Sequence, residues 1–285
     1  MSAIATFNPQ DLPANARIAL RCLDLTSLND QDTEDDIVAL CQRAQTPYGP
    51  VAAVCVWPRF VALARSLLPA EIRVAAVANF PDGALDAARA VADVQHILVA
   101  GGDEVDVVLP YRTLMRLHDH VQGQYPDGLN QSHECAEFLA QVRAACGSLT
   151  LKVIIESGEL RNPALITQAT RLAIRAGADF VKTSTGKTPV SATPEAAAAM
   201  LGEIARAVEP SGNPSVGFKA SGGIRTVADA LPYLTLVAAH AGTTALAPER
   251  FRIGASSLLN DILAVLAGRL GAAAMSAAVP GSTSY

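Results

Sequence analysis

Residues 149–187 read LTLKVIIESGELRNPALITQATRLAIRAGADFVKTSTGK, and this stretch decides the fold. Two short apolar runs, at 149–156 and 178–183, enclose a longer segment with helical spacing. The runs are mostly apolar at both alternating positions, which is typical of parallel strands covered on both faces. The stretch therefore predicts a strand, a covering helix and a second strand parallel to the first.

The same unit recurs along the whole chain. Helix-start signals stand between the apolar runs: Asp32 or Thr33 before an acidic turn, Pro194 at a first helical position, and Thr226 three residues before Asp229. Further strand-like runs lie at 18–25, 51–56, 72–78, 103–109, 215–220 and 250–254. Eight such units predict a (β/α)8 TIM barrel, an α/β fold of parallel strands with outer helices. A doubly wound open sheet is the alternative, but no Gly-x-Gly-x-x-Gly motif follows any run.

We expect a single TIM-barrel domain over residues 1–285, because half of the residues are hydrophobic and no second domain is indicated. Two segments depart from the pattern. A polar connection from about 116 to 133 is predicted to be an inserted surface loop, and a tail of small residues from about 271 is predicted to be flexible.

Charge and targeting signals indicate a soluble, cytoplasmic protein. The formal net charge of −5 provides no basic surface for nucleic acid. The N-terminus lacks the features of a secretory signal, and polar residues at 260, 261 and 269 argue against a membrane span. Five cysteines without a CxxC pair indicate reduced thiols. A homodimer is compatible with the sequence, which does not fix the oligomeric state.

Lys182 and Lys219 each lie in an apolar run that leads into a polar turn, in ADFVKTSTGK and SVGFKASGGIR. A buried lysine must pair, move out or lose its proton, and a neutral lysine is a nucleophile towards aldehydes and ketones. We interpret Lys182 as this nucleophile and Lys219 as the neighbouring cation that favours the neutral amine. The alternative is that either lysine pairs with Asp106 or Glu156 in a structural ion network.

Catalytic groups in TIM barrels lie at the C-terminal ends of the strands. Polar residues near the predicted strand ends are Asp24, Asp106, Lys152, Glu156, Lys182 and Lys219. Asp106 is interpreted as a group that holds Lys219 or relays a proton through water, or as a counter-ion only. Asp24 either caps a turn before Thr26 and Ser27 or bonds a substrate hydroxyl.

Glycine- and serine-rich turns indicate a phosphate site. Two glycines follow the seventh predicted strand, and two serines join the eighth to its helix. These are the loops in which barrel enzymes commonly bind phosphate, although the serines alone also fit an N-cap pair. The candidate ligands are Gly186, Lys187, Gly222, Gly223, Ser256 and Ser257.

The histidines and cysteines offer no metal site, so we expect no metal and no cofactor. No HxxxH or Cys/His cluster is present, and His118 and His120 fit a solvated loop pair. Cys55 is expected to be a small buried residue, because no histidine stands beside it to activate the thiol.

Five segments, EVDVVLPYR, LKVIIESGEL, AGADFVKTSTGK, VGFKASGGIRT and FRIGASSLL, resemble the successive signature segments of the deoxyribose-phosphate aldolase family (DeoC family, class I aldolases). The resemblance runs from about Leu23 to Tyr285. It implies a Schiff base between Lys182 and acetaldehyde, with Lys219 as the perturbing cation. Asp106 would work with Lys219 and water in proton transfer.

The resemblance also implies roles in substrate binding. The six candidate phosphate ligands would hold a 5-phosphate, with Arg225 near its rim. Asp24 and Thr185 would contact substrate hydroxyls, and the C-terminal Tyr285 would assist proton transfer from a mobile tail. Ala220 stands where some members have proline, a change expected to alter loop stiffness more than chemistry.

The activity that the resemblance implies is the reversible cleavage of 2-deoxy-D-ribose 5-phosphate to D-glyceraldehyde 3-phosphate and acetaldehyde. The expected partner is a small-molecule phosphosugar. Two alternatives remain open: another class I phosphosugar aldolase or a transaldolase, and a non-catalytic phosphosugar-binding barrel.

Overall fold

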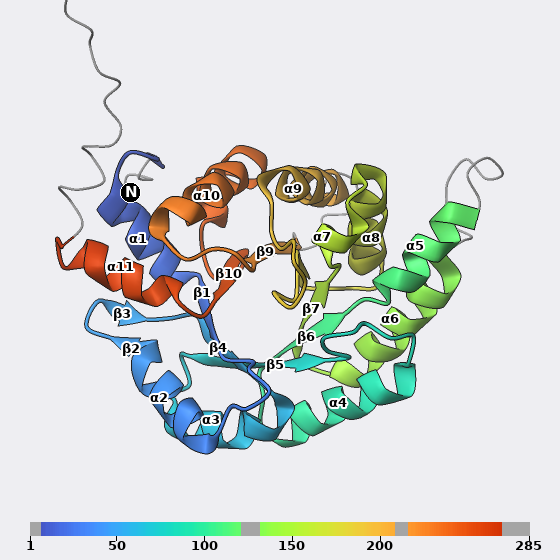
Figure 1. The fold of residues 1–285 in the computed structure, drawn as a ribbon, viewed down its shortest axis with the longest axis horizontal. Coiled ribbons are helices and arrows are strands. Elements are labelled where there is room, and N and C mark those ends of the chain that lie inside the picture. Colours follow the sequence, from blue (N-terminus) through green and yellow to red (C-terminus); the bar gives the residue numbers. More distant parts are fainter. Residues whose placement is uncertain (1–6, 121–131, 209–215, 270–285) are drawn as a thin grey trace, which may run out of the picture.

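A closed barrel of parallel strands lies at the centre of the computed structural model, which describes residues 7–120, 132–208 and 216–269. Helices surround the barrel (Figure 1). β1 pairs with both β4 and β10, and this pairing closes the sheet. The strands, in their order around the barrel, are β1 (Leu23–Thr26), β10 (Phe251–Ala255), β9 (Gly217–Ser221), β8 (Phe180–Lys182), β7 (Thr150–Ile154), β6 (Glu104–Val108), β5 (Arg73–Ala78) and β4 (Ala53–Val56). The predicted TIM barrel is confirmed.

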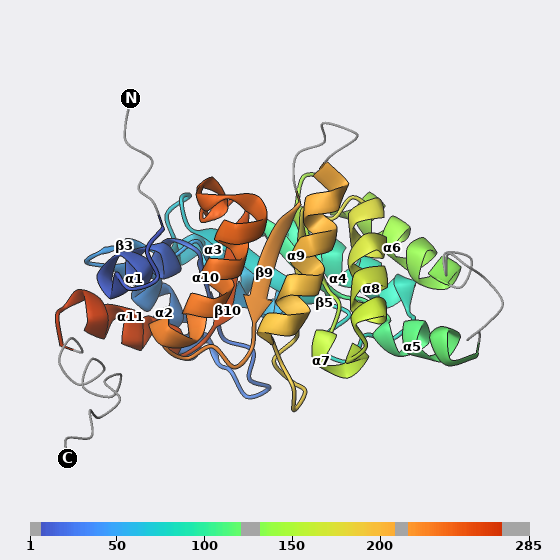
Figure 2. The ribbon, with the colours of Figure 1, turned by 90° about the horizontal axis from the view of Figure 1, so that it is seen from above.

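The outer layer consists of helices in chain order around the barrel. Figure 2 shows α8, α9 and α10 side by side along one flank, where α9 contacts both neighbours. The helices are α1 (Leu12–Arg21), α2 (Glu34–Ala44), α3 (Val61–Leu67), α4 (Ala87–Val99), α5 (Tyr111–His120), α6 (His133–Cys146), α7 (Ser157–Leu160), α8 (Pro163–Arg175), α9 (Pro194–Val208), α10 (Val227–Ala241) and α11 (Leu258–Leu266). A small hairpin of β2 (Gln45–Thr46) and β3 (Gly49–Pro50) and the 3-10 turns η1 (Pro58–Phe60) and η3 (Thr243–Ala245) complete the described elements.

The predicted helix starts are confirmed. Thr33 caps α2 and forms a capping box with Asp36, and Thr226 caps α10 in the same way with Asp229. α9 begins at Pro194, whose fixed φ suits the first turn of a helix.

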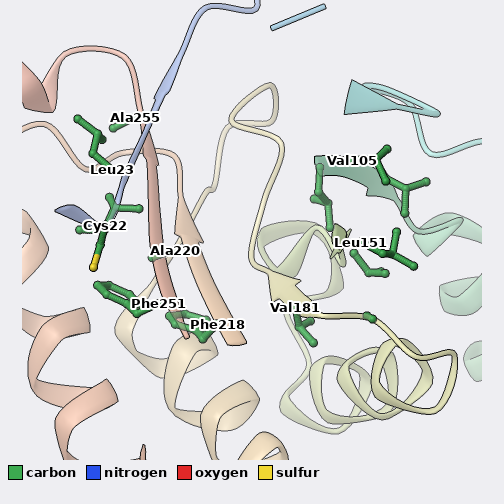
Figure 3. Close-up of a cluster of buried hydrophobic side chains, with 14 of the residues drawn as sticks. Cys22, Leu23, Val105, Leu151, Val181, Phe218, Ala220, Phe251 and Ala255 are labelled. Atoms are coloured by element: carbon green, nitrogen blue, oxygen red, sulfur yellow. The ribbon is translucent and has the colours of Figure 1, made fainter. Parts of the chain in front are cut away.

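Alternation along the strands separates the core from the barrel interior. Successive strand residues point to opposite faces, so apolar residues that flank a charged one lie between strand and helix. These outward residues belong to the main hydrophobic core, and Figure 3 shows several of them. They include Leu23, Val105, Leu151, Val181, Phe218 and Phe251. The residue after each of these carries a charge and lies on the inner face of the barrel. The expected pattern of apolar residues on both faces therefore holds only for β4 and for β5, in which Arg73 is the single exposed charged residue.

Two predicted boundaries are wrong. The first strand was expected over 18–25, but α1 continues to Arg21 because Asp11 caps it and Ile18 to Leu20 pack as helix. The polar connection was expected to begin at about 116, but α5 continues to His120, since the first helix-breaking residue is Gly123. α6 begins at His133, and residues 121–131 of the predicted insertion lie outside the described residues.

Two further expectations concern cysteines and membrane spans. All five cysteines are free and buried, which agrees with the predicted reduced thiols. Across the three described ranges, no helix has the length and apolar character needed to cross a bilayer. The predicted flexible tail and Tyr285 lie outside the described residues.

Candidate active site

Seven charged side chains meet inside the barrel, and all of them are buried. The cations come from four consecutive strands and the acids from β1 and β6. Strand register places Lys182 beside Lys219, and Lys219 beside Arg252. The seven residues are Lys152, Lys182, Lys219 and Arg252, with Asp24, Glu104 and Asp106. The barrel thus holds four cations against three carboxylates.

Asp106 is the centre of this cluster. Its Oδ2 atom lies 2.7 Å from the amine of Lys182 and 2.7 Å from the amine of Lys219. Its Oδ1 atom lies 2.9 Å from the amine of Lys152. One carboxylate therefore serves three amines, so it cannot neutralise each of them. The two lysines that the sequence singled out share one oxygen atom.

A second set of ion pairs lies below Asp106, towards the N-terminal ends of the strands. Glu104 lies 2.5 Å from Lys152 and 2.9 Å from Arg252. The Asp24 carboxylate lies 2.7 Å from the guanidinium of Arg252 and 2.5 Å from the amine of Lys219, so it links these two cations. The contacts form a continuous ring of ion pairs, and every carboxylate in it touches at least two cations.

The charges keep Lys219 protonated and Asp106 ionised. Burial lowers the pKa of Lys219, but Asp106 and Asp24 outweigh it and hold that pKa above its ordinary value. Burial raises the pKa of Asp106, but Lys152, Lys182 and Lys219 more than offset this and hold it well below the usual range. Lys219 is thus a permanent cation at neutral pH, as the sequence interpretation required.

A pocket of about 560 Å³ opens at the C-terminal ends of the strands. Its walls come from the turns after β1, β8, β9 and β10, which are far apart in the sequence. Its lining contains every predicted phosphate ligand and two further predicted residues: Thr185, Gly186, Lys187, Gly222, Gly223, Arg225, Ser256 and Ser257. Of these residues Lys187, Arg225 and both serines are exposed, so their polar groups are accessible to a ligand.

The pocket walls depend on glycine. Gly186, Gly222 and Gly223 have φ angles of 79°, 87° and 81°, in the region that favours glycine. A Cβ on Gly222 would also collide with the side chain of Ser191. The sequence therefore needs glycine here for the backbone to form the pocket.

Glu156 holds the turn that follows Lys182. It is buried in a left-handed conformation with a φ of 54°, just after β7. Thr185 donates to it from its hydroxyl at 2.5 Å and from its backbone N–H at 3.3 Å, and Thr188 donates at 3.2 Å. Burial raises the pKa of Glu156, and the threonine hydrogen bonds offset this only in part.

One side of the barrel interior is apolar. Cys55, Ala75 and Val77 form a small cluster separate from the main core, and Trp57 and Phe80 pack against it. The Cys55 thiol senses the charges of the barrel lysines and Asp106, but burial dominates and raises its pKa to about 11. Cys55 therefore stays a neutral thiol, as expected of a buried residue without an activating base.

The structure decides against one of the two alternatives for Asp24, the turn cap. Its carboxylate caps no turn; Thr26 instead donates to the Asp24 backbone carbonyl at 2.9 Å. The side chain is fully buried beneath Lys219 and Arg252. Asp24 and Asp106 thus lie together with both predicted catalytic lysines, while Tyr285 lies outside the described residues.

Sequence reasoning missed Glu104 and Arg252, and it gave no role to Lys152. A compositional signal was available, because only four of the 22 basic residues are lysines. All four lie at this site: Lys152, Lys182 and Lys219 in the barrel and Lys187 in the pocket wall. Arginine serves every other basic position, so the amines are concentrated where the chemistry is expected.

A parallel barrel with amines and a shared carboxylate beneath a glycine-lined mouth places this chain among the TIM-barrel aldolases. More narrowly, it belongs to the DeoC/LacD family of aldolases, whose family model matches residues 18–264.

Solved structures agree with this assignment. A structure from Coccidioides immitis, provisionally named a deoxyribose-phosphate aldolase, is 29% identical, with a TM-score of 0.69; the match covers 86% of this chain and 85% of that one. Another provisionally named deoxyribose-phosphate aldolase, from Toxoplasma gondii ME49, is 23% identical over 93% of this chain and 98% of that one, with a TM-score of 0.78. The deoxyribose phosphate aldolase of Aeropyrum pernix is 23% identical over 91% and 98%, with a TM-score of 0.62. The last two comparisons support the fold alone.

Proposed function

We propose that this protein is a class I aldolase that reversibly cleaves 2-deoxy-D-ribose 5-phosphate to D-glyceraldehyde 3-phosphate and acetaldehyde. The carrying observation is the position of Lys182. Its amine shares an Asp106 oxygen with the Lys219 ammonium, and the pocket wall at Thr185 begins three residues later. In this proposal Lys182 is the nucleophile, Asp106 and Lys219 are the proton-transfer groups, and the pocket that begins at Thr185 is the anion site.

In the proposed reaction the neutral Lys182 amine attacks C1 of the open-chain sugar, and loss of water gives a protonated imine. The electron pair of the C2–C3 bond moves into this imine while the C3 hydroxyl loses its proton. D-Glyceraldehyde 3-phosphate leaves, and the remaining enamine takes a proton at C2. Water then hydrolyses the imine, which releases acetaldehyde and restores the amine.

Asp106 and Lys219 are suited to the proton transfers. A carboxylate held ionised beside a permanent cation is a weak base, so we assign Asp106 to holding the water that carries the proton, in a fixed position beside Lys219. The apolar wall of Cys55 and Val77 is suited to the two-carbon fragment, which carries no polar group beyond C1. These roles explain why charge occupies only part of the barrel interior.

The mouth pocket is suited to the phosphate. Lys187 and Arg225 supply positive charge, and the glycine turns allow the backbone to approach closely. Ser257, in the pocket lining, directly precedes α11, whose first N–H groups have no partner within the helix. A substrate whose phosphate binds there would extend its aldehyde down the barrel towards Lys182.

Borohydride reduction with substrate tests the proposal, because it converts the imine into a stable adduct. We expect the adduct on the peptide that contains Lys182, and the other three lysines serve as internal controls. Lys182→Ala should reduce acetaldehyde release at least about 1,000-fold, whereas Lys187→Ala should keep the adduct. An adduct on Lys152 or Lys219, or none, would contradict the assignment.

A product assay distinguishes the substrate classes. Acetaldehyde formation from 2-deoxy-D-ribose 5-phosphate supports the proposed reaction. Cleavage of ketose phosphates alone would instead favour another class I aldolase of the same family.

A further inference from the structure

The ring of ion pairs continues below the reacting groups to the opposite end of the barrel. Glu104 and Arg252 lie at its base and line a separate cavity of about 1030 Å³ at the N-terminal ends of the strands. Among the described residues no ion pair joins either side chain to Lys182. Arg252 reaches Asp106 through Glu104 and Lys152, or through Asp24 and either Lys219 or Lys152. The proposed reaction uses neither residue.

We propose that Arg252 and Glu104 are positioning residues that set the pH at which Lys182 becomes a neutral nucleophile. The inference rests on the proposed function. The ring holds four cations and three carboxylates, so one positive charge is in excess. Arg252 cannot give up a proton, and Lys152 and Lys219 each contact at least two carboxylates, whereas within the described part of the chain Lys182 forms an ion pair with Asp106 alone. Lys182 is therefore the lysine with the fewest carboxylate partners in the cluster.

A further acid, Glu156, lies outside the ring. It makes its hydrogen bonds to threonines and forms no ion pair among the described residues. Burial raises the pKa of Glu156 and the charge of Lys182 lowers it in part, so the two groups interact electrostatically without direct contact. Cys55 stays a neutral thiol, and β5 contributes the apolar Ala75 and Val77 to the inner face, while Arg73 at the start of that strand is exposed and pairs with Asp103. The charged and titratable groups on the inner faces of the strands and in the turns around Lys182 are Asp24 on β1, Cys55 on β4, Arg73 on β5, Glu104 and Asp106 on β6, Lys152 on β7, Glu156 after β7, Lys187 after β8, Lys219 on β9 and Arg252 on β10.

The effect of Arg252 on Lys182 can be estimated from strand spacing. Arg252 and Lys182 are both register partners of Lys219, so they are two strands apart, roughly 10 Å. With an effective dielectric constant of about 20, one unit charge at that separation shifts a protonation midpoint by about one pH unit. Removing Arg252 should raise the midpoint for imine formation, and removing the Glu104 charge should lower it.

The experiment measures the rate at which acetaldehyde and cyanoborohydride form a reduced adduct on the Lys182 peptide, from about pH 5 to about pH 10. Glu104→Gln should move the midpoint down by about one unit, and Arg252→Met should move it up by about one unit. The double variant should return it towards the wild-type value. Arg252→Lys, which keeps the charge, should leave it in place. A role in packing alone would not give shifts of opposite sign.

Arg73→Gln is the matched control, because Arg73 lines the same basal cavity but pairs with Asp103 outside the ring. It removes one positive charge at the same end of the barrel and should leave the midpoint unchanged. If Arg252→Met does not fold, Glu104→Gln must still lower the midpoint.

The outcomes separate the two proposals. A wild-type adduct whose midpoint does not move in Glu104→Gln, or moves upward, overturns this inference and leaves the aldolase function standing. Absence of any wild-type adduct on Lys182 overturns the proposed function and this inference with it.

Discussion

Replacing Asp106 with Asn tests the central contact of the site. The carboxylate receives amines from Lys152, Lys182 and Lys219, at 2.9, 2.7 and 2.7 Å. Asparagine keeps the shape but removes the charge, and its NH2 group cannot accept a hydrogen bond from an amine. The variant therefore leaves four buried cations against two carboxylates. We expect the protein to lose both stability and activity.

The size of the loss follows from two limits. Breaking a buried ion pair by removing one partner costs about 3–5 kcal/mol. A lysine left without a partner can instead deprotonate, which at pH 7 costs about 5 kcal/mol relative to an ordinary lysine. Both routes give a destabilisation of about 3–5 kcal/mol for Asp106→Asn.

The assay is urea denaturation followed by circular dichroism at several pH values. Because the pKa of Asp106 is held well below its ordinary value, its stabilising contribution is complete above the unfolded pKa of about 4. The difference between wild type and Asp106→Asn should therefore be constant from about pH 5 to about pH 8, and it should shrink as the pH falls further.

Asp82→Asn provides the control, because Asp82 forms a comparable 2.7 Å pair with Arg89 at the surface. That pair should contribute less than about 1 kcal/mol. The reasoning is refuted if Asp106→Asn is as stable as the wild type at pH 7, or if its deficit grows as the pH falls below about 4.

Three further predictions concern neighbouring positions. Gly254→Ala should destabilise the protein by about 1–3 kcal/mol in thermal denaturation, because its Cβ would lie 2.7 Å from Ser221 Oγ and 3.1 Å from Lys219 Cε. Gly202→Ala, with open space around it, should instead stabilise α9 slightly. Lys219→Met should be less stable than the wild type in urea denaturation. Because the pKa of Lys219 is raised in the folded protein, this difference in stability should persist up to about pH 10 and shrink above it. A difference that vanishes by about pH 8 would contradict this. Ser256→Asp should raise the KM for the phosphorylated sugar at least about tenfold by charge repulsion. It should leave the KM for unphosphorylated 2-deoxyribose unchanged, and steady-state kinetics showing equal effects on both would rule out a phosphate site there.

Local pattern was sufficient for the barrel and for much of the rim. Thr33 and Thr226 predict the starts of their helices because a capping residue acts within one helical turn. The strands are recognisable in the sequence because strands buried on both faces consist of consecutive apolar residues. Lys182 and Lys219 were conspicuous because a charge inside such a run is costly. The glycine turns followed from the backbone conformation that only glycine adopts readily.

Boundaries that depend on packing were predicted less well. Residues 18–20 are apolar enough for a strand, but they lie in the last turn of α1, which packs against α11. Residues 116–120 are polar enough for a loop, but α5 extends through them. For α1 the tertiary contact with α11 determined the outcome, whereas for α5 the absence of a helix-breaking residue before Gly123 allows the helix to continue.

By itself, the amino-acid sequence determined the parallel barrel, the two lysines at its rim and the turns that line its mouth, because each depends on residues close together in the chain. Only the tertiary structure decided which charges meet. Lys219 and Asp24 are 195 residues apart, and Arg252 and Asp24 are 228 apart, yet each pair is in direct contact. Closure of the barrel and the register of its strands bring these side chains together, and no local pattern encodes that register. The excess positive charge inside the barrel is therefore a property of the fold.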